Sequence, residues 1–290
     1  MPEEAAAMAA TVSLPIYSRD DIIRTYREFP DHLGTRRHIE RYSQNPADVR
    51  DIALQGLDLS DVKSALDLGC GYGFFTEKLA RRLEPGTEIT GIDLVDEGCR
   101  DVFLRTVSEA GCTGRFIASH ADCIRDMPGA LFDVVCASYS LYFFPHLISA
   151  IARILKPHGL FLTITHSQES LREIIRFIPA ARSRGLAITR LLRMFSAENG
   201  RSQLQEYFDS IEQLPYPNRL VFPHENIEDC CDYLSKKRGL LFKEVAQTRP
   251  QELDTTIQRF LIDIRQHAEQ NRCLAITKND CVFRCRNPKH

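Results

Sequence analysis

Three glycines alternate with larger residues directly after an apolar run, in the stretch ALDLGCGYGFFTEKLARRL at residues 65–83. They are Gly69, Gly71 and Gly73, and the run before them carries the carboxylate of Asp67. Glycine has no Cβ, so the backbone at such a turn can come close to a ligand. A dinucleotide-binding turn has the pattern G-x-G-x-x-G, and here Phe74 stands where the third glycine belongs. The spacing therefore predicts a ligand held against bare backbone and argues against a nicotinamide dinucleotide.

This stretch starts within the first of five apolar runs that alternate with amphipathic segments. The runs cover residues 62–69, 87–93, 114–120, 131–138 and 160–167. Between them, apolar residues recur at helical spacing, as Phe75, Leu79 and Leu83 do after the first run. Strands and helices in regular alternation predict a doubly wound parallel sheet. Such sheets bind ligands beyond the carboxyl ends of their strands, which is where the glycine turn lies.

The segments on either side of this alternation predict further elements. Residues 18–29 and 45–57 have helical spacing behind candidate caps at Ser18 and Asn45. After the fifth run we expect helical pieces at 169–178, 186–195 and 202–214, a helix near 225–239, a sixth strand at 240–248, a helix at 253–269 and a last strand at 281–288.

The expected fold class is α/β: a doubly wound, seven-stranded, mostly parallel sheet with an antiparallel last strand, plus N-terminal helices and a helical lid insertion. We expect four regions along the chain. They are an N-terminal helical cap (1–60), the ligand-binding α/β core (61–167), a helical lid that selects the substrate (168–223) and the C-terminal part of the core (224–290).

The glycine turn and the next strand end together resemble a known family. LDLGCGYG followed by GIDL resembles the class I S-adenosylmethionine-dependent methyltransferases, and the resemblance covers roughly Val62 to Ser167, including FDVVCASYSLYFFPHLISAIARILKPHGLFLTI. It implies S-adenosylmethionine as the cofactor. It also implies a set of cofactor-binding residues: Asp67, Gly69, Cys70, Gly71, Gly73, Asp93, Leu94, Asp122, Cys123 and Ser138.

The resemblance also implies roles for members of this set. Asp67 and the glycine turn would cradle the methionine part and the ribose. Asp93 would accept hydrogen bonds from both ribose hydroxyls, which suits a carboxylate because it offers two acceptor oxygens. Leu94 would pack against the adenine, Asp122 would accept from the adenine amine, and the Cys123 backbone would meet the ring.

The cofactor implies the chemistry. A sulfonium is an activated methyl donor, so the protein must mainly align a nucleophile with the methyl carbon and exclude water. A hydroxyl or ammonium acceptor also needs a base within hydrogen-bond reach. The candidates at strand ends are His166, Tyr142 and His146, with Tyr139 beside them, and we rank His166 first because imidazole titrates near neutrality.

The predicted acceptor is a small molecule that is methylated on oxygen, nitrogen, sulfur or carbon. ASYSLYFFP differs from the [DNS]-P-P-[FY] motif of enzymes that methylate nucleobases or glutamine, and no acidic metal cluster of the catechol type is visible. Arginines outnumber acids in 168–223, which indicates either a solvated helix face, the more common case, or a carboxylate or phosphate on the acceptor. The alternatives left open are a cofactor-binding protein without catalysis, an aminopropyltransferase, and a methyltransferase for a protein or metalloid acceptor.

Composition argues against several other classes of protein. The 290 residues carry a formal net charge of −2, so no basic field favours nucleic acid. No run approaches about 18 apolar residues, which argues against a membrane span. The acidic start MPEEAAAMAA lacks the pattern of a secretory signal, so we expect a cytoplasmic protein. The sequence leaves the oligomeric state open.

The ten cysteines do not predict a metal site. Most stand singly inside apolar segments, where a free buried thiol is the ordinary case in a reducing compartment. The cluster Cys273, Cys281 and Cys285 lacks the paired C-x-x-C spacing of structural zinc. We therefore expect free thiols and no bound metal.

Overall fold

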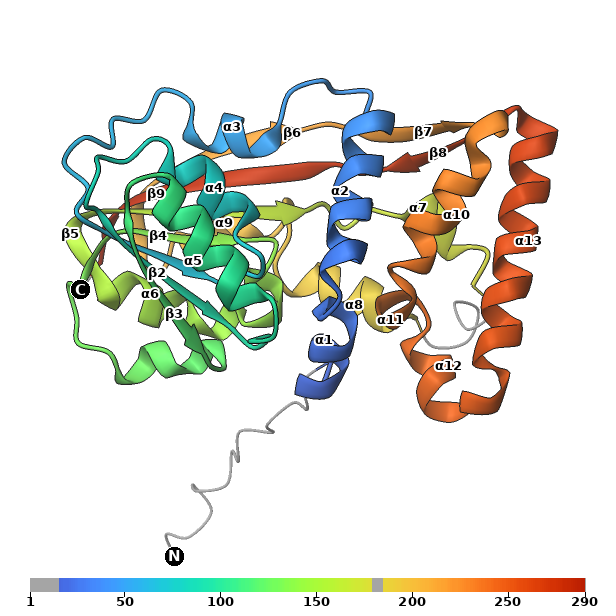
Figure 1. Cartoon of the computed structure of the whole chain (residues 1–290), viewed down its shortest axis with the longest axis horizontal. Coiled ribbons are helices and arrows are strands. Elements are labelled where there is room, and N and C mark those ends of the chain that lie inside the picture. The colour runs from blue at the N-terminus through green and yellow to red at the C-terminus, as the bar shows by residue number, and fades with distance from the viewer. Residues whose placement is uncertain (1–15, 179–184, 290) are drawn as a thin grey trace, which may run out of the picture.

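The computed structural model describes residues 16–178 and 185–289, and its centre is a seven-stranded sheet of order β3-β2-β1-β4-β5-β9-β6 (Figure 1). The strands are β1 (Ser64–Leu68), β2 (Glu88–Asp93), β3 (Thr113–Ala118), β4 (Phe132–Ser138), β5 (Leu155–His166), β6 (Phe208–Tyr216) and β9 (Asp280–Pro288). The first five are parallel, and β9 runs antiparallel between β5 and β6. The predicted mostly parallel sheet with an antiparallel last strand is confirmed.

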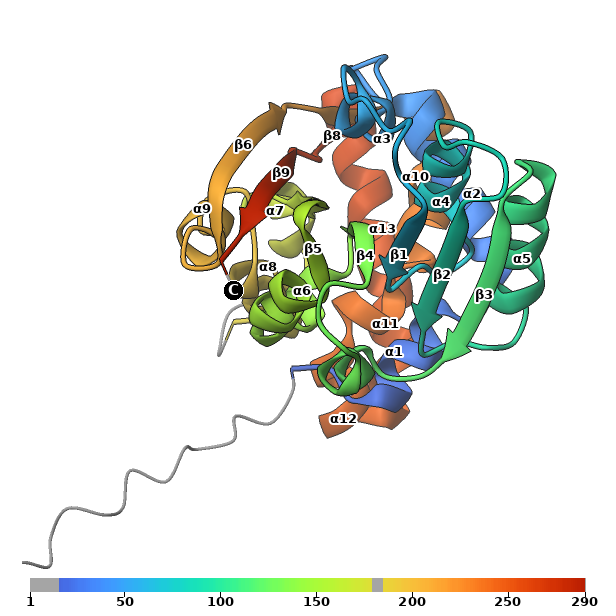
Figure 2. The same cartoon turned by 90° about the vertical axis from the view of Figure 1, so that its left-hand side faces the viewer.

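Helices cover both faces of the sheet (Figure 2). The helices α3 (Val49–Leu54), α4 (Phe74–Ala80) and α5 (Cys99–Glu109) pack on one face, and α6 (Ile148–Ile154) packs on the other. Side chains along a strand point alternately to the two faces. On β4, accordingly, Val134 and Cys136 belong to the core under α4 and α5, whereas Val135 and Ala137 belong to the core under α6. Burial on both faces explains the continuous apolar runs of the sequence.

The N-terminal segment forms α1 (Arg19–Tyr26) and α2 (Phe29–Tyr42) ahead of α3. Ser18 caps α1 in a capping box with Asp21, as the sequence predicts. The predicted cap at Asn45 is wrong, because α3 begins later and its N-cap is Asp48, which accepts from the Arg50 amide. Figure 1 shows α2 crossing in front of the sheet edge, between the α/β core and the C-terminal helices.

The predicted helical lid at 168–223 is helical only in its first part. It contains α7 (Arg172–Ile175), α8 (Ala187–Met194) and α9 (Gly200–Leu204), followed by the strands β6 and β7 (Arg219–Pro223). The helix expected at 202–214 stops at Leu204 because the chain then turns to pair with β9 as an edge strand. Pro215 is tolerated in β6 because an edge strand leaves some amides without a partner.

The remaining C-terminal elements are α10 (Ile227–Ser235), α11 (Arg238–Leu241), α12 (Lys243–Thr248), α13 (Leu253–Asn271) and β8 (Cys273–Thr277), which pairs with β7 in a separate two-stranded sheet. The sixth strand predicted at 240–248 is wrong. This segment forms α11 and α12, with Leu241 and Val245 buried four residues apart, a spacing that also fits a helix. Within the described residues, no helix combines the length and apolar character that crossing a bilayer requires.

We expect Phe283→Ala to destabilise the fold strongly, because the ring is 0% exposed on β9 and packs edge-on against Phe195. Truncating a buried phenylalanine costs about 3–5 kcal/mol. Urea unfolding measures this loss, with Ile262→Ala as control because Ile262 is 50% exposed. Equal urea midpoints for the two variants would contradict the assignment of β9 to the core.

Candidate active site

A cavity of about 1330 Å³ opens at the carboxyl edge of the parallel strands. The turns after β1, β2 and β4 form its floor, α1, α2 and α8 contribute side walls, and the start of β9 closes one end. Of the residues predicted from the sequence, those that line the cavity are Asp67, Gly69, Cys70, Gly71, Asp93, Leu94, Ser138, Tyr142 and His146. Gly73, Asp122, Cys123 and His166 are not among its lining residues.

The structure gives different physical reasons for glycine at positions of this turn. All have positive φ, at 76° for Gly69, 48° for Gly71 and 74° for Gly73. A Cβ on Gly69 would lie 2.5 Å from the Ser140 Cβ, so this glycine allows close packing with the loop after β4. A Cβ on Gly71 would meet nothing within 4 Å, because Gly71 faces the cavity. Gly71 therefore offers bare backbone to a ligand.

Asp93 connects the end of β2 to this turn. Its Oδ2 accepts a hydrogen bond from the Gly71 amide at 2.8 Å, and its Oδ1 accepts from the Val95 amide at 2.9 Å. Burial raises the pKa of Asp93, while these amides and that of Leu94 act to lower it. The carboxylate thus sets the position of the turn and also lines the cavity.

Asp67 is buried at the end of β1, with 1% of its surface exposed. Its Oδ2 accepts from the Thr76 hydroxyl at 2.5 Å, whereas Oδ1 has no hydrogen-bond partner in the described part of the chain. Burial raises the pKa of Asp67 to about 7. A buried acceptor without a donor is costly. The ammonium group of a methionine moiety would supply that donor, so these residues fit the cofactor that the resemblance implies.

The predicted adenine contacts are less direct than expected. Asp122 bonds to His146, with 3.0 Å between Oδ1 and Nε2, and it also pairs with His120 and Arg125. Burial acts to raise the pKa of Asp122, but the hydrogen bond and charge of His146 outweigh it, so the pKa is lowered. Ser119, His120 and Ala121 line the cavity instead of Asp122 and Cys123. The roles of Asp122 and Cys123 stay predictions.

His166, ranked first as a base, lies behind the cavity wall. Its Nδ1 is 2.6 Å from Asp280 Oδ1, and its ring stacks near Tyr139 and Tyr142, with centroids 4.7 and 5.8 Å away. Burial lowers the pKa of His166, which favours the neutral imidazole. Tyr142 and His146 do line the cavity, and burial raises the pKa of the Tyr142 phenol well above its usual value. Tyr142 therefore stays protonated at neutral pH.

Lys278 and Asp280 are among the cavity residues that the sequence analysis did not single out. Asp280 begins β9 opposite His166, and its Oδ2 accepts from the Tyr139 hydroxyl at 2.7 Å and from Lys278 Nζ at 2.6 Å. The signal in the sequence was the charged group TKND directly before the last strand. An antiparallel strand starts at the edge where its parallel neighbours end, so such charges reach the ligand edge.

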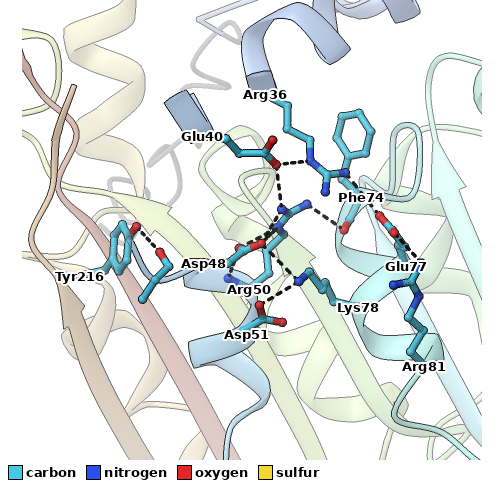
Figure 3. Close-up of polar contacts among 11 residues, drawn as sticks. Arg36, Glu40, Asp48, Arg50, Asp51, Phe74, Glu77, Lys78, Arg81 and Tyr216 are labelled. Atoms are coloured by element: carbon cyan, nitrogen blue, oxygen red, sulfur yellow. Dashed lines mark hydrogen bonds and ion pairs between the residues drawn. The ribbon is translucent and has the colours of Figure 1, made fainter. Parts of the chain in front are cut away.

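An ionic network that includes cavity-lining residues joins α2, α3 and α4 (Figure 3). Arg50 is central to it, with Nη2 2.6 Å from Asp48 Oδ2 and Nη1 donating to the Phe74 carbonyl at 3.2 Å. Arg36 of α2 pairs with Glu40 at 2.7 Å and with Glu77 of α4 at 3.3 Å. The network therefore ties the N-terminal wall of the cavity to the helix that follows the glycine turn.

The lid segment contributes less than expected to the cavity. Arg190, Leu191 and Met194 of α8 line it. Arg172 is exposed and pairs with Glu169 and Glu173, and Arg176 contacts His267. Arg193 and Arg201 do not line the cavity either, and Arg182 and Arg184 lie outside the described residues. In the part of the chain that the structure describes, no three histidine, cysteine, aspartate or glutamate side chains gather as a metal site.

We expect Arg50→Met to loosen the N-terminal wall, because it removes the charge-assisted bonds to Asp48 and Phe74. Such bonds are worth about 1.5–3 kcal/mol each. Hydrogen-exchange mass spectrometry should show α2 amides exchanging roughly ten times faster, with β1 and β4 unchanged. Arg105→Met, at an exposed position of α5, is the control. Unchanged exchange in α2 would mean that the network does not hold this wall.

Comparison with known proteins shows similarity to methyltransferases over part of the chain. Residues 65–159 match the family model described as a methyltransferase domain. The chain is 34% identical over 118 residues to a ubiquinone biosynthesis O-methyltransferase of Shewanella pealeana, covering 39% of this chain and 48% of that protein. It is 34% identical over 132 residues to the nocamycin O-methyltransferase of Saccharothrix syringae, covering 43% and 46%. The chain thus spans about half the length of these relatives.

Solved structures show the same fold. The YcgJ protein of Bacillus subtilis has a TM-score of 0.51 at 15% identity, over 83% of this chain and 98% of that one. A phosphoethanolamine N-methyltransferase of Haemonchus contortus, solved with S-adenosylhomocysteine, has a TM-score of 0.51 at 15% identity, over 96% of this chain and 61% of that one. Residues 65–159 are therefore similar to the methyltransferase domain in sequence, and the chain as a whole has the fold of these solved structures.

Proposed function

We propose that this protein transfers the methyl group of S-adenosylmethionine to a nucleophilic atom of a small-molecule acceptor by in-line displacement. The observation that carries the proposal is the arrangement of Asp67, Gly71 and Asp93. A buried carboxylate oxygen without a donor, an open glycine and a second carboxylate line one cavity at the carboxyl edge of the sheet. The relatives named as O-methyltransferases support the same reaction class.

When bound, the cofactor supplies an electrophilic methyl group on a sulfonium. The chain's own residues bind and orient the cofactor, and they exclude water from the cavity. Asp67 would take the cofactor ammonium, Gly71 would admit it against the backbone, and Asp93 would accept from the ribose hydroxyls. Apolar and aromatic side chains such as Phe143, Tyr72 and Leu191 line the remaining cavity and keep it poor in water.

Residues after β4 would position the acceptor. Tyr142 stays protonated, so its phenol can donate a hydrogen bond to the acceptor but cannot act as a base at neutral pH. His146 lines the cavity with its Nε2 held against Asp122, which makes it the candidate base when the nucleophile is a hydroxyl or ammonium. His166 acts on the acceptor only through Asp280 and Tyr139.

The acceptor is proposed to carry an anionic group, and the protein to act in the cytoplasm. Arg172 and Arg176 do not support the anionic group, because they do not line the cavity, whereas Arg190 of α8 does line it. A screen of metabolite extracts for a mass gain of one methylene, dependent on both protein and cofactor, would identify the acceptor. Cofactor binding without any methylated product would favour the alternative of a binding protein.

We expect Gly71→Val to abolish S-adenosylhomocysteine binding measured by calorimetry, because a branched side chain would enter the ligand's space at a φ of 48°. The matched control is Gly86→Val, which has comparable backbone strain, with φ 85° and open space, but does not line the cavity. Comparable affinity in the two variants would show that the turn does not bind the cofactor.

We expect Asp93→Ala to weaken S-adenosylhomocysteine binding at least tenfold, because hydrogen bonds to a charged acceptor are worth roughly 1.5–3 kcal/mol each. The control is Asp96→Ala, since Asp96 is half-exposed and pairs with Arg100. Retained affinity in the Asp93 variant would remove the ribose assignment.

The pKa of Asp67, raised to about 7 by burial, predicts a pH dependence of cofactor binding. A cationic ammonium favours the ionised carboxylate, which forms as the pH rises through this pKa, so affinity should increase with pH. For S-adenosylhomocysteine we expect an increase of about tenfold between pH 6 and 8. Asp67→Asn, which cannot ionise, should bind more weakly at pH 8 and lose this pH dependence. A wild-type affinity independent of pH would mean that Asp67 does not contact the ammonium.

A further inference from the structure

A continuous row of aromatic rings joins α1 to the ends of β4 and β5. Tyr26 of α1 meets Phe143 edge-on, with ring centroids 6.2 Å apart, and Phe143 lies 4.9 Å from Tyr142. Tyr142 lies 5.8 Å from His166, whose ring is 4.7 Å from that of Tyr139. The four tyrosine and phenylalanine rings of this aromatic row line the cavity, whereas His166 does not.

The aromatic row ends at a buried ion pair between Lys278 and Asp280. Lys278 Nζ is 4.8 Å from the ring centroid of Tyr139 and 2.6 Å from Asp280 Oδ2. Asp280 also accepts from the Tyr139 hydroxyl at 2.7 Å and lies 2.6 Å from His166 Nδ1. Lys278 and Asp280 are 7% and 3% exposed, and both line the cavity. The pair is therefore held in place by its neighbours and presents no net charge of its own to a ligand.

Both members of the ion pair have hydrogen-bonding capacity left over. An ammonium carries three N–H groups, and Lys278 uses one on Asp280 and directs one at the Tyr139 hydroxyl 3.5 Å away. The third has no acceptor among residues 16–178 and 185–289. A carboxylate offers about four lone-pair sites, and Asp280 has three donors. One free donor beside one free acceptor suits a hydroxyl group, which both accepts and donates.

The charges of the pair also select against ions. A ligand ammonium would be repelled by Lys278, and a ligand carboxylate would be repelled by Asp280. The tyrosines add no charge, because burial raises the pKa of Tyr139 and Tyr142 well above the usual value and keeps both phenols protonated. A neutral hydroxyl is therefore the polar group that fits this end of the cavity.

The aromatic row indicates what carries this hydroxyl. Aromatic rings bind another ring in edge-to-face or offset contact more strongly than an alkyl group of similar area. Aromatic faces also attract cations, but Lys278 already lies over Tyr139. The cavity of about 1330 Å³ exceeds the roughly 300–1,000 Å³ of ordinary ligand pockets, so it has room for a ring beside the cofactor.

We propose that the aromatic row and the Lys278–Asp280 pair bind the methyl acceptor as an aromatic ring that carries a neutral hydroxyl group. This inference rests on the proposed function and narrows its acceptor class. The ring packs along the aromatic row, while the hydroxyl accepts from Lys278 Nζ and donates to Asp280. Tyr139 and His166 are positioning residues, because they act through Asp280.

Ligand-observed NMR titrations of the protein saturated with S-adenosylhomocysteine test this inference, with phenol, toluene and cyclohexanol as probes of similar size. We expect phenol to bind about fivefold more tightly than either of the others, because toluene lacks the hydroxyl and cyclohexanol lacks the aromatic ring. Tetramethylammonium, a fourth probe, should bind more weakly than phenol, because Lys278 repels it.

Phe143→Leu tests the aromatic row, because it keeps apolar bulk and removes one ring. The preference for phenol over cyclohexanol should fall to less than about twofold. The matched control is Phe177→Leu, which removes a half-buried ring that lies beside His267 and does not line the cavity. This control should keep the preference of the wild type.

Lys278→Met tests the ion pair and should remove the preference for phenol over toluene while S-adenosylhomocysteine affinity stays within about twofold. Lys278→Arg keeps the charge and donors, so it should retain the preference, and it decides the test with the wild type if the methionine variant fails to fold. Equal wild-type affinities for phenol, toluene and cyclohexanol, tighter binding of tetramethylammonium, or an unchanged preference in Phe143→Leu would overturn the inference. Failure of the wild type to bind S-adenosylhomocysteine would instead overturn the proposed function.

Discussion

The hydrogen bond from the Gly71 amide to Asp93 is the interaction on which the cofactor site depends. It joins the turn after β1 to the end of β2, so two neighbouring strands present their ends to one ligand. The turn can approach the carboxylate because Gly71 has a positive φ and no side chain. Asp67 lies near the end of β1, just before the turn. It is buried there, and its Oδ1 has no hydrogen-bond donor in the described part of the chain. The open backbone of the turn and the two carboxylates, which together suit a cationic ligand, therefore come from one local arrangement.

The cavity needs further walls, and distant parts of the chain supply them. The helices α1 and α2 contribute to one wall, where Arg36 of α2 pairs with Glu77 of α4 and Arg50 of α3 donates to the Phe74 carbonyl of α4. This network is made of partly buried charges, and it lies next to the helix that starts at the glycine turn. These side chains thereby link the position of the N-terminal wall to the position of the helix that follows the glycine turn.

The antiparallel direction of β9 explains which charged side chains line the cavity beside β5. Because β9 runs opposite to β5, its first residue, Asp280, pairs with the last residue of β5, His166. Lys278 and Asp280 therefore arrive at the edge that the parallel strands use for ligands. A parallel strand in this place would have brought Asn287 and Pro288 there instead.

The sequence alone determined the α/β core and its cofactor turn, because these depend on local patterns. Apolar runs of strand length, helical spacing between them and glycines that permit positive φ are all read within short stretches of the chain. Asp67, Gly71 and Asp93 were singled out in this way, since each stands at the end of a predicted strand or in the turn that follows it. The antiparallel strand at 281–288 was also predicted from its own residues.

Only the tertiary structure decided what covers the cavity and which charges reach it. Residues 202–216 and 240–248 carry short apolar spacings that fit either a helix or a strand. In the first segment, Phe208–Tyr216 pairs with β9 as a strand. The second segment contains the helix Lys243–Thr248. His166 was expected in the cavity because it ends a strand, but its neighbours Tyr139 and Tyr142 line the cavity and His166 does not. The grouping of Asp280 with Tyr139 and His166 joins residues from separate elements, and no local spacing records such contacts, because packing in three dimensions creates them.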